Sequence, residues 1–155
     1  KENYLKDAEQ EYLKRLKKYT QIELIELPDS NIDDEKIALE KEKNQILKYI
    51  KPKEYLVTLE IEGNQLSSLA FADLKQINAY GFKSFADKID KTLITSSDIT
   101  FLIGGSYGIH PSIKEMSNYK LSFSKMTFPH QLFRILLLEQ LFRSYKILNN
   151  EKYHK

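Results

Sequence analysis

The chain has 155 residues, of which 41% are hydrophobic and 30% charged, and its formal net charge is +2. This length suits one domain with a full hydrophobic core, residues 1–155. Without cysteine, the chain can form no disulfide, thiolate nucleophile or cysteine-ligated metal site. No apolar run is long enough to span a bilayer, and the charged residues Lys1 and Glu2 do not resemble a signal peptide. We therefore expect a cytoplasmic protein that does not insert in membranes.

The charges are unevenly distributed along the chain. The segment 120–155 contains seven Lys or Arg and two Asp or Glu, a net +5, which leaves −3 for residues 1–119. A basic segment on a mildly acidic body favours an anionic partner, and RNA is a natural candidate. The alternative is a chance distribution in a small sample.

The first third of the chain has alternating helix and strand patterns. Residues 1–18 have apolar side chains at helical spacing, and 21–27 alternate as in a strand. A densely charged helix is predicted from a cap at Asp33 or Asp34 to about Ile50. Such a charge run most often forms a solvated helix face.

The middle of the chain continues this alternation. Residues 55–59 form a continuous apolar run, typical of a buried parallel strand, and 60–68 are predicted as a loop with Gly63-Asn64 at its turn. Helices are predicted over 69–80 and 85–95, and a second buried strand over 99–103. This order predicts an α/β fold with a mostly parallel sheet and helices on both faces.

The stretch 119–148 organises the chain. A short apolar run, 119–123, leads into a polar loop, 124–127, and Pro129 suits the first turn of a long helix. The helix is apolar on most faces, which predicts burial on more than one side. Its polar stripe contains Glu139, Arg143 and Lys146, and the first two have the spacing of a helical ion pair.

Three predicted strand ends are candidate ligand-binding loops, because ligands of parallel sheets bind beyond the carboxyl ends of the strands. They are 59–60, 104–108 and 123–128. The glycines of 104–108 lack the spacing of dinucleotide-binding and P-loop motifs, and a simple strand-to-helix turn explains them equally well. His110, His130 and His154 lack ligand spacing, so we expect no metal. No activated nucleophile is evident.

Four motifs together are distinctive. They are Ile103-Gly-Gly-x-x-Gly108, Leu121-Ser-Phe-Ser-Lys-Met-Thr-Phe-Pro-His130, Glu139-Gln-Leu-Phe-Arg143 and Tyr153-His154-Lys155. This combination closely resembles the ribosomal RNA large subunit methyltransferase H family of the SPOUT class. The resemblance is strong over residues 99–155 and looser over 1–60.

The resemblance implies a fold, a cofactor and a substrate. SPOUT proteins have an α/β fold with a C-terminal trefoil knot, an exception to the rule against knots. They use S-adenosylmethionine and act as homodimers. In this family the substrate is a pseudouridine in helix 69 of the 23S ribosomal RNA, methylated at N3 on assembled ribosomes.

The resemblance also implies site residues. The residues matching the family's cofactor loops are Leu59, Gly104, Phe123, Ser124, Lys125, Met126, Thr127 and Phe128. The residues matching its catalytic and substrate-side positions are His130, Glu139, Arg143, Tyr153 and His154. The proton on the pseudouridine N3 must leave, and either His130 or His154 could accept it, or Arg143 could stabilise the developing anion. The sequence does not choose between these roles.

The chain departs from the family at two places. Family members have a β-strand before the first helix, and without it we expect an unpaired sheet edge. The segment between Ser68 and Ile99 is longer than usual, and we interpret residues near 69–81 as a surface insertion away from the cofactor loops. We expect the apolar helix 132–148 to pack against its twin in the dimer.

Two other functions are weighed against methyl transfer. A catalytically inactive module of the same fold would bind RNA or the ribosome without chemistry, and the missing strand favours it. A nucleotide-binding scaffold is supported only by the glycine loop. Binding of S-adenosylmethionine would distinguish the enzyme from the inactive module.

Overall fold

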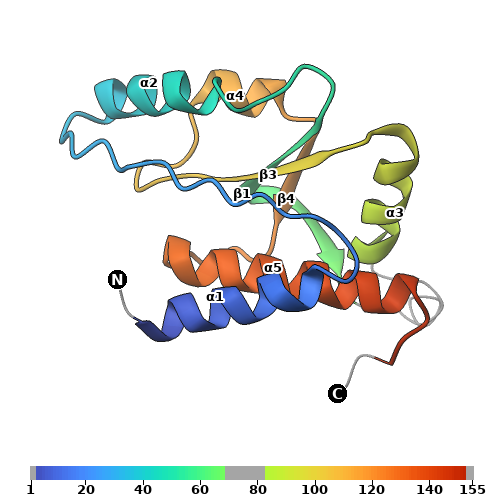
Figure 1. Ribbon diagram of the computed structural model, residues 1–155. Coiled ribbons are helices and arrows are strands. Elements are labelled where there is room, and N and C mark those ends of the chain that lie inside the picture. Colours follow the sequence, from blue (N-terminus) through green and yellow to red (C-terminus); the bar gives the residue numbers. More distant parts are fainter. Residues whose placement is uncertain (1–2, 69–82, 153–155) are drawn as a thin grey trace.

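The computed structural model describes residues 3–68 and 83–152, and in them a parallel sheet lies between two layers of helices (Figure 1). The helices are α1 (Asn3–Leu16), α2 (Glu35–Ile46), α3 (Phe85–Thr95), α4 (Pro111–Met116) and α5 (His130–Leu148). Helices α1 and α5 cover one face of the sheet, and α2 and α4 cover the other (Figure 1). The predicted α/β fold with helices on both faces is confirmed.

The sheet is organised around its longest strand. Its strands are β1 (Tyr55–Ser67), β2 (Lys83–Ser84), β3 (Ile99–Ile103) and β4 (Tyr119–Ser122). Strand β1 pairs with each of the other three, always in parallel. Leu59 of β1 is the register partner of Ile103 on one side and of Leu121 on the other. The carboxyl ends of β1's first half, β3 and β4 therefore meet at one edge.

The prediction of a loop over residues 60–68 is wrong, because β1 continues to Ser67. Its register against β4 shifts between Leu59 and Asn64, and Gly63 lies within this irregularity. A Cβ atom on Gly63 would be 2.8 Å from the backbone of Lys120 and Leu121. Gly63 thus allows the backbone of β1 to come close to that of β4, and it does not form a turn.

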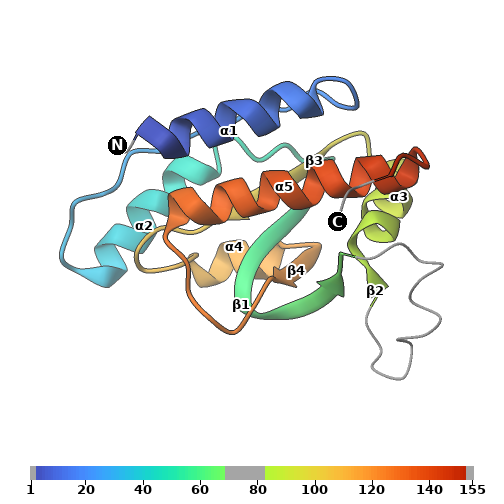
Figure 2. The ribbon, with the colours of Figure 1, turned by 90° about the horizontal axis from the view of Figure 1, so that it is seen from below.

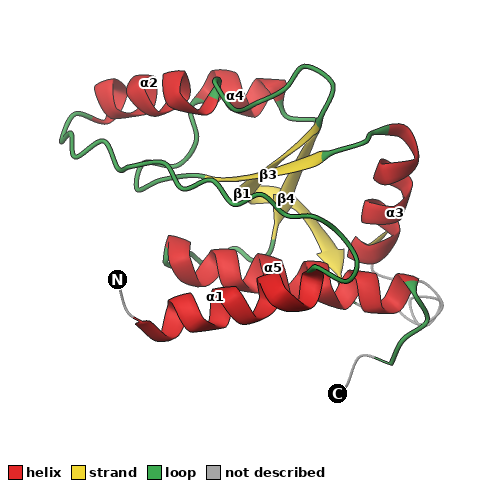
Figure 3. Ribbon diagram, in the orientation of Figure 1, coloured by secondary structure: helices red, strands yellow, loops and turns green. Residues whose placement is uncertain are grey.

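The predicted strand over residues 21–27 is also wrong. The segment belongs to a long stretch without regular structure (Figure 3), and Leu24 and Ile25 are 38% and 44% exposed. A strand needs a neighbour to complete its hydrogen-bond ladder, and none of the described strands pairs with this segment. Among the described strands, β3 has a neighbour on one side only, which is β1. Its five residues are partly buried, whereas the sequence predicted a fully buried strand.

The helix predictions agree better with the structure. Helices α1 and α3 are confirmed, and α2 is capped by Asp34, whose Oδ1 accepts from the Ile37 N–H at 3.0 Å. Helix α2 ends at Ile46, four residues earlier than predicted. Helix α4 was not predicted. The predicted helix 69–80 and the insertion near 69–81 lie outside the described residues.

Helix α5 is buried on more than one side, as predicted. Its Leu137, Leu138 and Leu141 belong to a core shared with β1, β4, α1 and α3. Helix α1 runs beside it (Figure 2). Just after α1, the Tyr19 ring stacks on Tyr145 of α5 with ring centres 5.8 Å apart. These apolar faces are covered within one chain, so their burial does not require a twin helix, and the dimer stays a prediction.

Candidate functional site

The predicted cofactor residues follow strands whose carboxyl ends meet. Leu59 is buried at the paired end of β1, Gly104 follows Ile103 of β3, and Phe123 follows Ser122 of β4. Because the register aligns Leu59 with both neighbours, these three positions lie at one edge of the sheet. This is the edge where parallel sheets bind ligands.

The glycine loop after β3 is a tight turn that leaves no space for a side chain at Gly104. A Cβ on Gly104 would be 2.6 Å from the carbonyl carbon and oxygen of Gly108. The Gly108 N–H donates to Gly105 O at 3.0 Å, and Gly108 has φ +83°, which favours glycine. Directly after β3, at Gly104, the loop therefore presents backbone at the sheet edge.

Residues before and within α2 flank this turn, and the sequence did not indicate them. The Glu42 carboxylate lies 3.1 Å from where a Cβ on Gly105 would be. Ser30 Oγ donates to Glu42 Oε1 at 3.3 Å, and the Tyr107 hydroxyl donates to Asp33 O at 3.2 Å. These are contacts between distant parts of the chain, which no local sequence pattern reveals.

The loop 123–128 is held at both ends by one residue of α5. The Phe133 ring makes an edge contact with Phe123 at 5.0 Å and a stacked contact with Phe128 at 5.8 Å. Inside the loop, the Met126 N–H donates to Ser124 Oγ at 3.0 Å. The loop is thus anchored on the helix that carries the predicted catalytic residues.

His130 lies near this loop. It is exposed and is the first residue of α5, one turn before Phe133. A side chain there can reach a molecule bound against the loop.

The predicted ion pair on α5 is confirmed. Arg143 Nη2 lies 2.8 Å from Glu139 Oε1, and their side chains are 33% and 16% exposed. Gln140 Nε2 donates to Glu139 Oε2 at 2.6 Å, and Ser68 Oγ donates to Gln140 Oε1 at 2.5 Å. The pair is therefore part of a polar network that reaches the end of β1.

His130 and the Glu139–Arg143 pair are not adjacent in one chain. Glu139 comes nine positions after His130 in the helix, roughly 13 Å along the axis, and the two side chains point to opposite sides of the helix. Tyr153 and His154 lie outside the described residues. Within the described residues, the candidate catalytic residues therefore lie at two separate places, His130 at one and the Glu139–Arg143 pair at the other.

Arg134 is a further residue that the sequence did not single out. Its Nε lies 2.7 Å from Glu9 Oε2 of α1, an ion-pair distance, although the geometry is not that of a hydrogen bond. Its Nη1 donates to Glu26 Oε2 at 3.4 Å. Arg134 therefore ties the start of α5 to α1 and to the segment 20–32.

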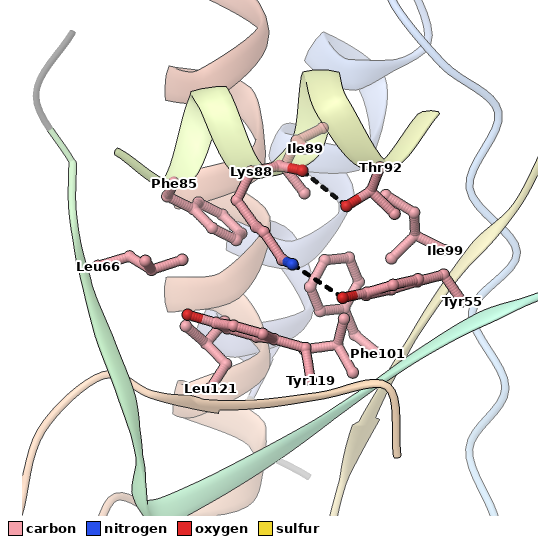
Figure 4. Close-up of a pocket in the computed structure, with 11 residues that line it drawn as sticks. Tyr55, Leu66, Phe85, Lys88, Ile89, Thr92, Ile99, Phe101, Tyr119 and Leu121 are labelled. Atoms are coloured by element: carbon pink, nitrogen blue, oxygen red, sulfur yellow. Dashed lines mark hydrogen bonds between the residues drawn. The ribbon is translucent and has the colours of Figure 1, made fainter. Parts of the chain in front are cut away.

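A small apolar cavity lies between α3 and the sheet, and the first residues of β1, β3 and β4 are among those that line it (Figure 4). Its volume is about 10 Å³, enough for at most one water. Lys88 Nζ donates to the Tyr55 hydroxyl at 2.8 Å and lies 4.3 Å from the Tyr119 ring centre. Burial, with a smaller contribution from Tyr55, raises the pKa of Tyr119. We interpret this cluster as structural.

Within residues 3–68 and 83–152, no cluster of three or more His, Cys, Asp or Glu could hold a metal ion. None of the helices in these ranges is both long and apolar enough to cross a membrane.

Comparison with known proteins finds a matching family model and similar proteins. A family model described as "Predicted SPOUT methyltransferase" matches residues 1–84 and 77–154. A protein named putative ribosomal RNA large subunit methyltransferase H from Methanococcus maripaludis is 46% identical over 162 aligned residues, covering 100% of this chain and 93% of the relative. Ribosomal RNA large subunit methyltransferase H from Clostridium tetani is 45% identical over 161, with the same coverage.

Proposed function

The chain belongs to the SPOUT methyltransferase family, and from this membership we propose that it methylates N3 of a pseudouridine in helix 69 of the 23S ribosomal RNA, using S-adenosylmethionine. The names of the relatives support ribosomal RNA as the substrate. We place the reaction in the cytoplasm, on assembled ribosomes. The C-terminal trefoil knot is part of the same proposal.

The observation that carries the proposal is the meeting of the middle of β1 with the loops that follow β3 and β4 at one sheet edge. Leu59 aligns with Ile103 and Leu121, which brings Leu59 beside the backbone that follows β3 and β4. The donor set suits S-adenosylmethionine: the turn at Gly104 and Gly105 offers backbone groups, and the Glu42 carboxylate beside Gly105 can accept from hydroxyl or ammonium groups. When bound, the cofactor supplies an electrophilic methyl group on a sulfonium.

The residues of the chain would act mainly by positioning. Methyl transfer needs the acceptor nitrogen aligned with the methyl group, and a well-held site supplies most of the rate enhancement. His130, beside the anchored loop, can accept the N3 proton, and Arg143 can stabilise the anion that forms. His154 is the alternative acceptor.

A homodimer would explain why the candidate residues form two groups. A two-fold axis can place the Glu139–Arg143 pair of one subunit near His130 of the other. Leu132, in the first turn of α5, is 38% exposed and is available for such an interface. Sedimentation at micromolar concentration tests this, and a monomer would count against a composite site.

The decisive experiment compares ribosomal RNA from cells with and without the gene. We expect mass spectrometry to show one methyl group missing from a pseudouridine in helix 69, restored by the wild-type gene but not by His130→Ala or Arg143→Ala. An unchanged RNA would reject the proposal.

Calorimetry separates the enzyme from its alternative. An inactive RNA- or ribosome-binding module of the same fold need not bind S-adenosylmethionine. Binding of the cofactor by the purified protein is expected, and its absence together with tight ribosome binding would favour the inactive module.

A further inference from the structure

The tip of the loop 123–128 presents an exposed apolar side chain on an anchored frame. Met126 is 72% exposed, and its neighbours Lys125 and Thr127 are exposed as well. Both ends of the loop are partly buried against the Phe133 ring. The three tip residues therefore project from a loop whose ends are fixed.

The frame also restrains the tip itself. Ser122 is buried, and its Oγ lies 2.8 Å from Ile61 O and 3.1 Å from Ser124 O. Ser124 Oγ in turn accepts from the Met126 N–H at 3.0 Å. The hydrogen bonds run from β1 through β4 to the tip, so little backbone entropy remains to be lost when the tip meets a partner.

We propose that the Met126 side chain contacts a nucleobase of the RNA substrate while Lys125 faces its phosphate backbone. This inference rests on the proposed function. A thioether makes favourable contacts with aromatic faces, and unstacked bases are held between aromatic or apolar side chains. An ammonium group on the adjacent residue supplies the sequence-independent attraction of a phosphate. The loop backbone serves the cofactor, and its tip serves the acceptor RNA.

The other methionine of the chain provides an internal control. Met116, at the end of α4, is 50% exposed, and the chain has no third methionine. Both thioethers are accessible to a soluble oxidant, so their relative oxidation reports which one becomes covered.

Oxidation footprinting tests the proposal without requiring catalysis. The protein is treated with dilute hydrogen peroxide alone, with S-adenosylmethionine, and with S-adenosylmethionine and ribosomes, and sulfoxide is measured at each methionine by mass spectrometry. Ribosomes should slow oxidation of Met126 about tenfold and leave Met116 within twofold. Equal rates at Met126 with and without ribosomes would overturn the proposal. Protection by the cofactor alone would assign the side chain to the cofactor, and protection that grows with protein concentration alone would assign it to a second copy.

Substitution gives a second, kinetic readout. Met126→Ala should raise KM for ribosomes about fivefold, with the sedimentation coefficient unchanged. KM is measured at saturating S-adenosylmethionine, because the resemblance counts Met126 among the cofactor-loop residues. Met126→Leu should largely restore KM, and Met116→Ala should behave as wild type. If wild-type protein binds ribosomes but never methylates them, the proposed function fails. The oxidation rate of Met126 with ribosomes then still shows whether its side chain contacts the RNA. If wild type is active and Met126→Ala keeps its KM, only the inference fails.

Discussion

Gly104 packs so closely against Gly108 that a Cβ atom on Gly104 would lie 2.6 Å from the carbonyl carbon and oxygen of Gly108. This approach folds the chain after β3 back on itself at the edge where Leu59 of β1 meets the ends of β3 and β4. The turn therefore places backbone, not a side chain, at Gly104 against this edge.

Gly104→Ala should destabilise the turn and the site together. The new methyl group meets backbone, which cannot rotate away, so we expect a loss of about 1–3 kcal/mol in the free energy of unfolding. Affinity for S-adenosylmethionine should fall as well. Urea denaturation and calorimetry measure the two effects, and a Gly104→Ala protein with wild-type affinity would contradict this role.

Gly108 supplies the matched control for that substitution. A Cβ there meets no atom within 4 Å, but φ is +83°. Gly108→Ala should cost about 1–2 kcal/mol through backbone strain alone, and Gly108→Asn less, because asparagine tolerates this region better.

Phe133→Leu should loosen the loop 123–128. The substitution removes two ring contacts, with Phe123 and Phe128, and should cost about 1–3 kcal/mol of stability. It should also weaken cofactor binding. Phe142→Leu on the same helix removes ring contacts with Tyr12 and Tyr19 instead. We expect a similar loss of stability there with unchanged cofactor affinity; equal affinity losses would show that the effect is global.

Lys88→Met should lower stability without affecting the candidate site. It removes the hydrogen bond to Tyr55 and the cation–π contact with Tyr119, together worth about 1–2 kcal/mol. The cluster lies near the amino-terminal residues of the strands, so cofactor affinity should stay within twofold. A large loss of cofactor affinity would show that a change at this cavity alters the candidate site at the opposite edge of the sheet.

Glu151 makes the protein sensitive to acid. Hydrogen bonds from Lys146, Tyr19 and Lys18 lower its pKa from 4.5 to about 2. A lowered folded-state pKa gives stabilisation that is complete above pH 4.5 and is lost as the pH falls through 2. The urea midpoint of the wild type should fall over this window, and that of Glu151→Gln should fall less. Parallel pH curves for the two proteins would refute the assignment.

Removal of Tyr153 to Lys155 tests the C-terminal tail. We expect unchanged dimerisation and S-adenosylmethionine affinity but a collapse of ribosome methylation, because the resemblance places Tyr153 and His154 at the acceptor. Full activity of the shortened protein would make the tail dispensable. Loss of cofactor binding would instead place the tail in the cofactor pocket.

Much of the local structure could be predicted from the sequence. Helical spacing predicted α1 and α3, a cap at Asp33 or Asp34 predicted the start of α2, and the spacing of Glu139 and Arg143 predicted their ion pair. These features depend on residues three or four positions apart, so a local sequence pattern is enough to indicate them. The ends of the predicted strands are equally local signals, and they indicated 59–60, 104–108 and 123–128 as candidate positions.

Only the tertiary structure decided which segments find partners. Residues 21–27 alternate like a strand but have no neighbour among the described strands, whereas β1 continues through Gly63 because β4 lies against it. The apolar faces of α5 predicted burial but not that α1 and α3 provide it, and nothing near Arg134 in sequence indicated Glu9 or Glu26. A hydrogen-bond ladder, a helix contact and an ion pair across the fold each need a second segment. The side-chain pattern of one segment carries no information about which segment that is.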